Sequence, residues 1–422
     1  MMASNDEPGA VSGLGNQPKL RRGLTLPLLT LYGLGVTIGA GIYVLVGATA
    51  AKAGIYAPIS FLLAAVVVGF TGFSYCELGT RYPVSAGEAA YVRAGFNSRT
   101  LSLIVGLMVV ASGVVSAAAV AIGAAAYLQA FVPLSPQLLT GMVILLVGLV
   151  AVWGITESVA LAGLFTVIEV GGLGLVVYFG LQSRPEVLAD FATEFGMLMP
   201  PFEVGAWSGI LAAGLLAFFA FVGFEDMANV AEEVKEPGKT LPRGIILTLI
   251  MATMIYFIVV SVVVLVVPMS SLVGSAAPLA LIFESAGPMT SAMFNIVAII
   301  ATVNGALIQV IMASRVLYGL AAQGNLPQIF ANVNGLTRTP LPATALVVGI
   351  ILFLAYFLPI AELAKTTSTI VLIVFAFVNL ALLRLKCLGP EPSADVFRVP
   401  VWVPVLGFAS SCCLLLAGVL FV

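Results

Sequence analysis

The chain alternates between long apolar runs and short polar segments, and the apolar runs are long enough to cross a bilayer as helices. A membrane-spanning helix needs about 20 mostly apolar residues. We expect such helices near residues 27–51, 58–80, 100–131, 138–153, 158–182, 207–232, 243–268, 289–320, 341–359, 362–385 and 401–422. The pattern therefore predicts an all-α polytopic membrane protein.

The composition supports a membrane protein and narrows its chemistry. Of the 422 residues, 61% are hydrophobic and 9% are charged, whereas about a quarter of the residues in soluble domains are charged. The chain has no histidine, which excludes histidine-based catalysis, and its four cysteines lack metal-site spacing. We predict no catalytic residues, no metal and no cofactor. The net charge of −2 gives no footprint for nucleic acid, so the expected surroundings are the lipid bilayer.

The positions of Lys and Arg predict the orientation, because cytoplasmic loops retain these residues. With the N-terminus inside, all of the 17 Lys and Arg residues except Lys52, Arg184 and Lys365 fall on the cytoplasmic side. Residues 1–23 are polar and contain Gly and Pro, which is typical of a disordered tail. We therefore expect a multi-pass protein of the cytoplasmic membrane with a cytoplasmic N-terminus.

The first expected span is rich in glycine. The segment 32–47 contains Gly33, Gly35, Gly39, Gly41 and Gly47. Each glycine inside a helix costs roughly 1 kcal/mol relative to alanine, so the segment favours a break. Gly35 and Gly39 also have the GxxxG spacing of closely packed membrane helices, and glycine alone leaves that simpler interpretation open.

The sixth expected span strengthens the case for broken helices. Gly223 lies among aromatic residues and is followed by Glu225 and Asp226 at membrane depth, where an ionised carboxylate needs a cavity or a partner. This span begins five spans after the first. An odd number of spans inverts the second unit relative to the first, as in transporters built from inverted repeats. We expect one repeat over 24–182, a second over 207–385 and one extra span over 401–422.

Two breaks of this kind would leave backbone N–H and carbonyl groups free to bind a charged solute. Unwinding at 38–41 would free N–H groups at the positive end of a half-helix to hold a carboxylate. Carbonyl groups released at Val36, Thr37 and 219–222 would face an ammonium group. Such a break is tolerated only where it lines a cavity or is buried in protein.

Four stretches carry a resemblance to a known family: "GLGVTIGAGIYVLVG", "RYPVSAGEAAYVRAGF", "FFAFVGFEDMANVAEEVKEPGKTLPRGI" and "ASRVLYGLAAQGNLPQIFANVNGLTRTPLPA". Together, and in this order, they resemble the amino acid-polyamine-organocation superfamily of permeases. The resemblance implies a leucine-transporter-like fold of five plus five helices, whose central site opens alternately to each side.

The resemblance also implies roles for individual residues. It places the substrate carboxylate at the backbone of Gly39, Ala40 and Gly41, with Ile38 beside it. It places the substrate amine at the carbonyl groups of Phe219, Ala220 and Val222. An aromatic gate is expected at Phe219, Phe221 or Phe224, with simple packing an equal alternative for each.

Two acidic residues distinguish this chain within the resemblance. Glu169 stands where proton-coupled members often carry a lysine, so it is the candidate coupling residue, either titrating or helping to bind a cation; a neutral carboxyl hydrogen-bonded between helices is the alternative. Glu225 is expected at the cationic end of the substrate or at a gate, or else as a carboxylate that stabilises a helix start. Asn304 and Gln309 could face the cavity, although interhelical hydrogen bonds explain such residues more often.

These observations predict a secondary transporter that imports amino acids by alternating access with protons. A polyamine or amine carrier and an amino acid exchanger remain alternatives, and sodium coupling stays open. A membrane enzyme would need a clustered nucleophile, base or metal set, and a channel would need a polar pore stripe. Neither pattern is found in the sequence.

Overall fold

The computed structural model describes residues 23–39, 41–84, 87–153, 159–389, 391–393 and 395–420. Within them the longer helices are α1 (Leu26–Ile38), α2 (Gly41–Ala53), α3 (Ala57–Arg81), α4 (Gly87–Phe96), α5 (Arg99–Leu128), α6 (Pro136–Trp153), α7 (Val159–Ser183), α10 (Val204–Phe219), α12 (Pro237–Val266), α14 (Pro288–Ala322), α15 (Leu341–Phe357), α16 (Ile360–Leu388) and α17 (Trp402–Leu420). Short helices are α8 (Glu186–Ala189), α9 (Phe191–Gly196), α11 (Asp226–Asn229) and α13 (Met269–Leu272), with 3-10 turns at Gly54–Tyr56, Ala231–Glu233, Pro278–Phe283 and Gln328–Ala331. The only β interaction among the described residues is an isolated bridge between Leu24 and Val234. The predicted all-helical class is confirmed.

The apolar helices account for every expected span. Eight stretches of the described chain are long and apolar enough to cross a membrane: Gly41–Arg81, Arg99–Leu128, Pro136–Trp153, Gly163–Ser183, Pro237–Val266, Pro288–Ala322, Ile360–Leu388 and Trp402–Leu420. Three further apolar helices, α1, α10 and α15, are shorter. The chain is therefore a polytopic membrane protein, and two of its shorter helices are those predicted to be broken.

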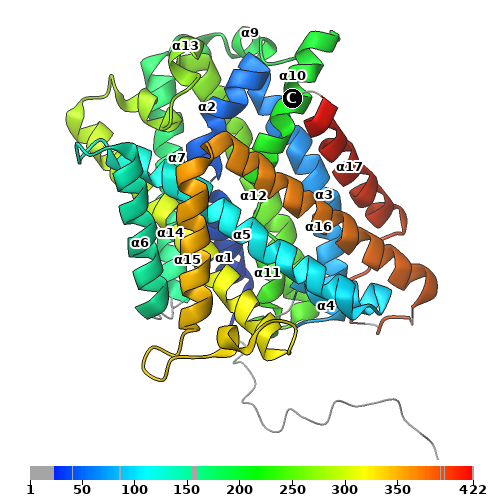
Figure 1. Ribbon diagram of the computed structural model, residues 1–422. Coiled ribbons are helices and arrows are strands. Elements are labelled where there is room, and N and C mark those ends of the chain that lie inside the picture. Colours follow the sequence, from blue (N-terminus) through cyan, green and yellow to red (C-terminus); the bar gives the residue numbers. More distant parts are fainter. Residues whose placement is uncertain are drawn as a thin grey trace, which may run out of the picture.

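The helices pack as a single bundle around the two interrupted segments (Figure 1). Helix α5 packs along α14 and α16, α12 packs along α3, and α10 packs against α2 and α3. Helix α1 contacts α7 and α12. In Figure 1, α4 and α11 lie toward the lower end of the bundle, whereas α2, α9 and α13 lie toward the upper end.

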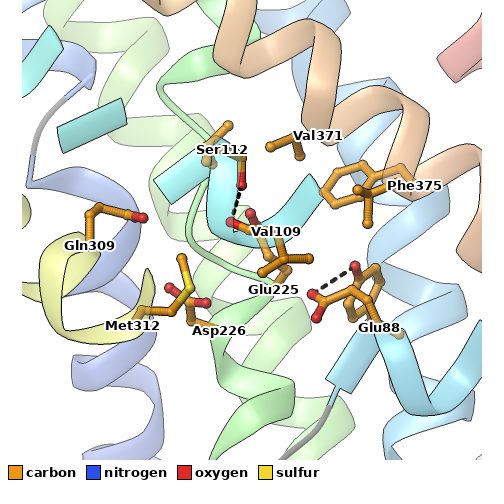
Figure 2. Close-up of a pocket in the computed structure, with 12 residues that line it drawn as sticks. Glu88, Val109, Ser112, Glu225, Asp226, Gln309, Met312, Val371 and Phe375 are labelled. Carbon is orange, nitrogen blue, oxygen red and sulfur yellow. Dashed lines mark hydrogen bonds between the residues drawn. The ribbon is translucent and has the colours of Figure 1, made fainter. Parts of the chain in front are cut away.

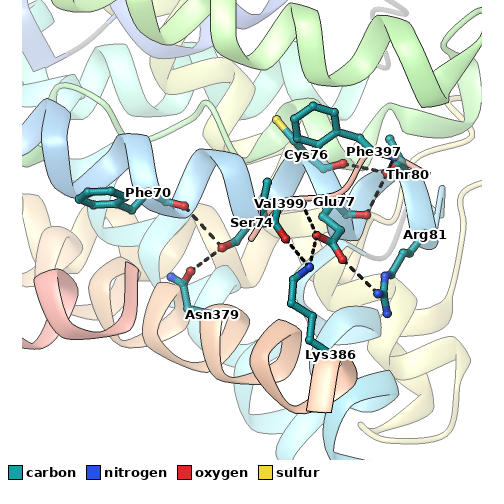
Figure 3. A network of polar contacts seen from close by, with 10 residues as sticks. All are labelled: Phe70, Ser74, Cys76, Glu77, Thr80, Arg81, Asn379, Lys386, Phe397 and Val399. Carbon is teal, nitrogen blue, oxygen red and sulfur yellow. Dashed lines mark hydrogen bonds and ion pairs between the residues drawn. The ribbon is translucent and has the colours of Figure 1, made fainter. Parts of the chain in front are cut away.

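An ion network ties three parts of the bundle together (Figure 3). The Glu77 carboxylate on α3 is fully buried and lies 3.0 Å from Arg81 Nη2 and 2.6 Å from Lys386 Nζ on α16. Glu77 Oε2 also accepts a hydrogen bond from the N–H of Val399 at 2.8 Å, and Lys386 donates to the Val399 carbonyl. One buried carboxylate thus joins α3, α16 and the segment that leads into α17.

A second polar contact seats α17 on the same two helices. The Asn379 side chain on α16 accepts a hydrogen bond from Ser74 and donates to Thr71, both on α3. Gly407 of α17 packs directly on Asn379, because a Cβ at Gly407 would lie 2.3 Å from Asn379 Oδ1. The last span is therefore an integral part of the bundle.

Candidate substrate site

The first interruption lies between α1 and α2. Helix α1 ends at Ile38, and α2 begins at Gly41; Ala40, one of the predicted site residues, lies outside the described residues. Gly41 packs directly on the other broken segment, since a Cβ there would lie 2.3 Å from the Cα of Ala220. This close approach explains why the start of α2 needs glycine.

The second interruption follows α10. The helix ends at Phe219, and residues 220–225 form turns before α11 begins at Asp226. Gly223 has φ +118°, a conformation that side chains rarely adopt, and a Cβ there would lie 2.7 Å from the carbonyl oxygen of Val36. The two interruptions therefore lie side by side, with Gly41 on Ala220 and Gly223 on Val36.

A tyrosine from a third helix contacts carbonyl groups of both interruptions. The hydroxyl of Tyr256, on α12, lies 2.9 Å from the Thr37 carbonyl oxygen and 2.7 Å from the Ala220 carbonyl oxygen. Tyr256 is fully buried. Its single proton serves one carbonyl at a time, so the other carbonyl retains capacity for an incoming donor.

We expect Tyr256→Phe to destabilise both interruptions. The change removes the one hydroxyl donor that two buried carbonyl groups share, which costs about 1–3 kcal/mol. The melting temperature of the protein in detergent should fall. Tyr178→Phe is the control, because Tyr178 is 60% exposed. Equal melting temperatures for the two variants would contradict the role given to Tyr256.

A small cavity lies beside the second interruption (Figure 2). Residues of α3, α4, α5, α14 and α16 line it together with Val222, Glu225 and Asp226. It offers about 10 Å³ to the centre of a water molecule, which is room for about one water. We name it the carboxylate cavity, because Glu88, Glu225 and Asp226 all line it.

Each of the three carboxylates accepts a hydrogen bond from another residue of the described chain. Tyr75 donates its hydroxyl to Glu88 Oε1 at 3.1 Å, and the N–H of Gly223 donates to Glu225 Oε2 at 2.9 Å. The Asn229 amide lies 3.3 Å from Asp226 Oδ1. Glu225 thus satisfies a peptide group released by the second interruption.

The carboxylate cavity carries acidic groups without a basic one. None of the described residues that line it is Lys or Arg. Helix α4 lies outside the candidate spans, and burial raises the pKa of its Glu88 carboxyl, an effect that the hydrogen bond from Tyr75 offsets in part. A cation entering the cavity would favour the ionised form of Glu88.

The three candidate gate residues lie in different surroundings. Phe219 borders a second, apolar gap beside α2 and α5. The Phe221 ring packs on Tyr256 at 5.0 Å between centroids, and Phe224 packs on Tyr75 and on Phe375 of α16 at 5.6 and 5.4 Å. Phe224 therefore packs against two residues that line the carboxylate cavity, whereas Phe219 borders a different gap.

Glu169 lies on α7, a helix that packs against α1. It is fully buried on α7, and its Oε1 accepts a hydrogen bond from Asn304 Nδ2 on α14 at 3.1 Å. The hydroxyl of Tyr43, on α2, donates to the Glu169 backbone carbonyl. Asn304 is next to Gly305, whose Cα would lie 3.7 Å from a Cβ at Gly39. Helix α14 thus links the Glu169 carboxylate to the end of α1.

Comparison with known proteins identifies the family. The family model described as amino acid permease matches residues 24–422, which is nearly the whole chain. The chain belongs to the amino acid permease family.

The relatives of the chain are named for different substrates. The permease is 29% identical to the branched-chain amino acid permease BcaP of Bacillus subtilis, over 96% of this chain and 90% of the relative. It is 28% identical to the methylthioribose transporter of the same organism, over 95% and 88%. It is 31% identical to the vacuolar cationic amino acid transporter 2 of Arabidopsis thaliana, over 90% of this chain and 62% of the relative.

The permease has cavity residues that the sequence did not single out. Glu88 lies inside the stretch "RYPVSAGEAAYVRAGF", yet no role was predicted for it, and Tyr75 and Ser112 also line the cavity. A signal was present for Glu88, because an acidic residue set among small apolar residues is unusual near a membrane. Gln309 lines the cavity, as the sequence suggested, whereas Asn304 donates a hydrogen bond to Glu169.

Proposed function

We propose that the permease is a secondary transporter that imports amino acids across the cytoplasmic membrane by alternating access, coupled to protons. Its N-terminus would be cytoplasmic; residues 1–22 of the tail predicted over 1–23 lie outside the described residues. Inverted repeats over 24–182 and 207–385 and an extra span over 401–422 would form a leucine-transporter-like bundle. The observation that carries this proposal is the direct packing of the two interruptions, Gly41 on Ala220 and Gly223 on Val36.

The proposed site has one backbone end for each charge of an amino acid. Helix α2 begins at Gly41, and the positive end of this half-helix would favour the substrate carboxylate, for which we propose the N–H groups of Gly39, Ala40 and Gly41. Carbonyl groups of Val36, Thr37, Phe219, Ala220 and Val222 would hold the ammonium group, with Ile38 beside the carboxylate. Tyr256 supports this arrangement, because its hydroxyl contacts the Thr37 and Ala220 carbonyl groups.

The positions of the three aromatic residues support a proposed role for each in gating. Phe219 would close the apolar side next to α2 and α5, since it borders the gap there. Phe224 would close the side of the carboxylate cavity with Tyr75 and Phe375. Phe221 packs on Tyr256 and would then hold the second interruption between these gates.

The alternative is a carrier of amines or polyamines, or an exchanger of amino acids. The three carboxylates around one cavity favour an amine. Binding of an amino acid and its amide to the purified protein separates an amino acid carrier from an amine carrier. An amino acid carrier loses affinity when the carboxylate is amidated, whereas an amine carrier does not.

Glu169 is the proposed coupling residue. We expect Glu169→Gln to abolish accumulation driven by a pH gradient in proteoliposomes while counterflow of the same amino acid continues, because the amide cannot carry the titrating proton. A sodium gradient in place of the pH gradient tests the remaining form of coupling. Unchanged concentrative uptake by the variant would remove Glu169 from the coupling step.

A further inference from the structure

We propose that α4 and the last turns of α16 form a binding site for the headgroup of an anionic membrane phospholipid. The site consists of two arginines, Arg93 on α4 and Arg384 on α16, and of an apolar stripe on α16 that leads away from Arg384. Neither arginine lines the carboxylate cavity or belongs to an interruption. The inference is therefore independent of the substrate and of the coupling ion.

The two arginines lie at the contact between α4 and α16. The helices pack closely there, because a Cβ at Gly95 would lie 2.7 Å from the Cα of Ala381. The guanidinium carbon of Arg384 lies 5.4 Å from the centroid of the Phe96 ring, which is a cation–π contact. Arg93 precedes Phe96 by three residues, so the two share one face of α4. Both guanidinium groups therefore belong to one surface, toward the lower end of the bundle (Figure 1).

Neither charge is neutralised by the described residues. Arg93 and Arg384 are exposed, and no ion pair in the described part of the chain includes either of them. Arg81 and Lys386 differ, because both pair with Glu77. The guanidinium of Arg384 is stacked on a ring and makes no hydrogen bond with a described residue. Its fork of N–H donors can therefore meet two oxygens of a phosphate.

The apolar stripe indicates a lipid instead of a free phosphate. Its members, Ile373, Phe377 and Leu380, are all partly exposed. They precede Arg384 by 11, 7 and 4 residues, and these intervals place all four side chains on one face of the helix. An acyl chain could lie along the stripe while the headgroup phosphate contacts the arginine at its end. A free phosphate would use the arginines alone.

The length of α16 places Arg384 at the level of lipid headgroups. The helix has 29 residues, whereas about 20 residues cross the hydrocarbon core of a bilayer. Arg384 belongs to its last two turns, which therefore extend past the core. Basic residues at this depth attract anionic lipids, because their charge meets the headgroup phosphates directly.

The experiment measures lipid binding to the full-length permease in detergent by native mass spectrometry. Phosphatidylglycerol and phosphatidylcholine with the same acyl chains are compared, so that only the headgroup differs. The wild type should bind phosphatidylglycerol at least about tenfold more tightly. Arg93→Gln and Arg384→Gln should each weaken phosphatidylglycerol about fivefold and leave phosphatidylcholine unchanged. Both positions are exposed, so the variants should fold, and a melting curve of each checks this.

Lys52→Gln is the matched control. Lys52 is exposed in the last turn of α2, which lies toward the upper end of the bundle (Figure 1), so this variant removes the same charge from the opposite end. It should keep the preference for phosphatidylglycerol. If it weakens that lipid as much as the arginine variants do, or if the wild type binds both lipids equally, there is no headgroup site. Glycerol 3-phosphate is the soluble probe, and equal binding of this probe and phosphatidylglycerol would contradict a lipid site.

Discussion

Replacing Glu77 with alanine is expected to destabilise the permease by about 3–5 kcal/mol. The side chains of Arg81 and Lys386, which flank this carboxylate, are only 8% and 10% exposed. Without Glu77 both cations would remain buried with no negative partner, and the Val399 N–H would lose its acceptor. The loss of one buried partner costs more than the intact ion pair contributes, because the remaining charges stay away from water.

The measurement is thermal unfolding of the purified protein in detergent, with aggregation during heating monitored by light scattering. Glu77→Ala should melt well below the wild type, and α17 should become accessible to proteolysis before the rest of the chain, because Val399 leads into it. Glu284→Gln, which changes an exposed carboxylate, serves as the control. A wild-type melting curve for Glu77→Ala would show that the network does not hold α3, α16 and α17 together.

Gly41→Ala is expected to weaken amino acid binding by about tenfold to a hundredfold. The new Cβ would lie 2.3 Å from the Cα of Ala220, and backbone cannot move aside as a flexible side chain can. Overpacking of this kind costs typically about 1–3 kcal/mol. It would act directly at the contact between the two interruptions, where the substrate is proposed to bind.

Gly69→Ala is the matched control for this prediction. A Cβ at Gly69, on α3, would meet nothing within 4 Å, and alanine favours the helix. Binding of radiolabelled amino acid to both variants, with folding checked by melting, gives the comparison. If Gly41→Ala binds as well as Gly69→Ala, the contact between the interruptions has no part in substrate binding.

Local sequence patterns were sufficient for the helices and their breaks. Apolar runs of membrane length predicted the spans, and the glycines near Gly39 and Gly223 predicted interruptions because glycine weakens a helix locally. Such signals depend on neighbouring residues alone. They therefore place α1, α2 and α10 well without any knowledge of the packing.

The residues that contact the two interruptions from other helices could not be predicted in this way, because no local sequence pattern marks them. Tyr256 is 219 residues from Thr37 and 36 from Ala220, and nothing in its own apolar span distinguishes it from a packing residue. Phe219, Phe221 and Phe224 share one local pattern, yet their surroundings differ because different helices face each of them. The carboxylate cavity likewise depends on how α4 packs against α11, which only the folded bundle reveals.

The central claim is that the two interruptions together hold the two charged ends of an amino acid. An experimental structure of the permease with a transported amino acid bound tests it most directly. We predict the carboxylate at hydrogen-bond distance, about 3 Å, from N–H groups at 39–41, and the ammonium group at the same distance from carbonyl groups at 219–222. A ligand bound away from both segments, or a continuous helix through either of them, would contradict the claim.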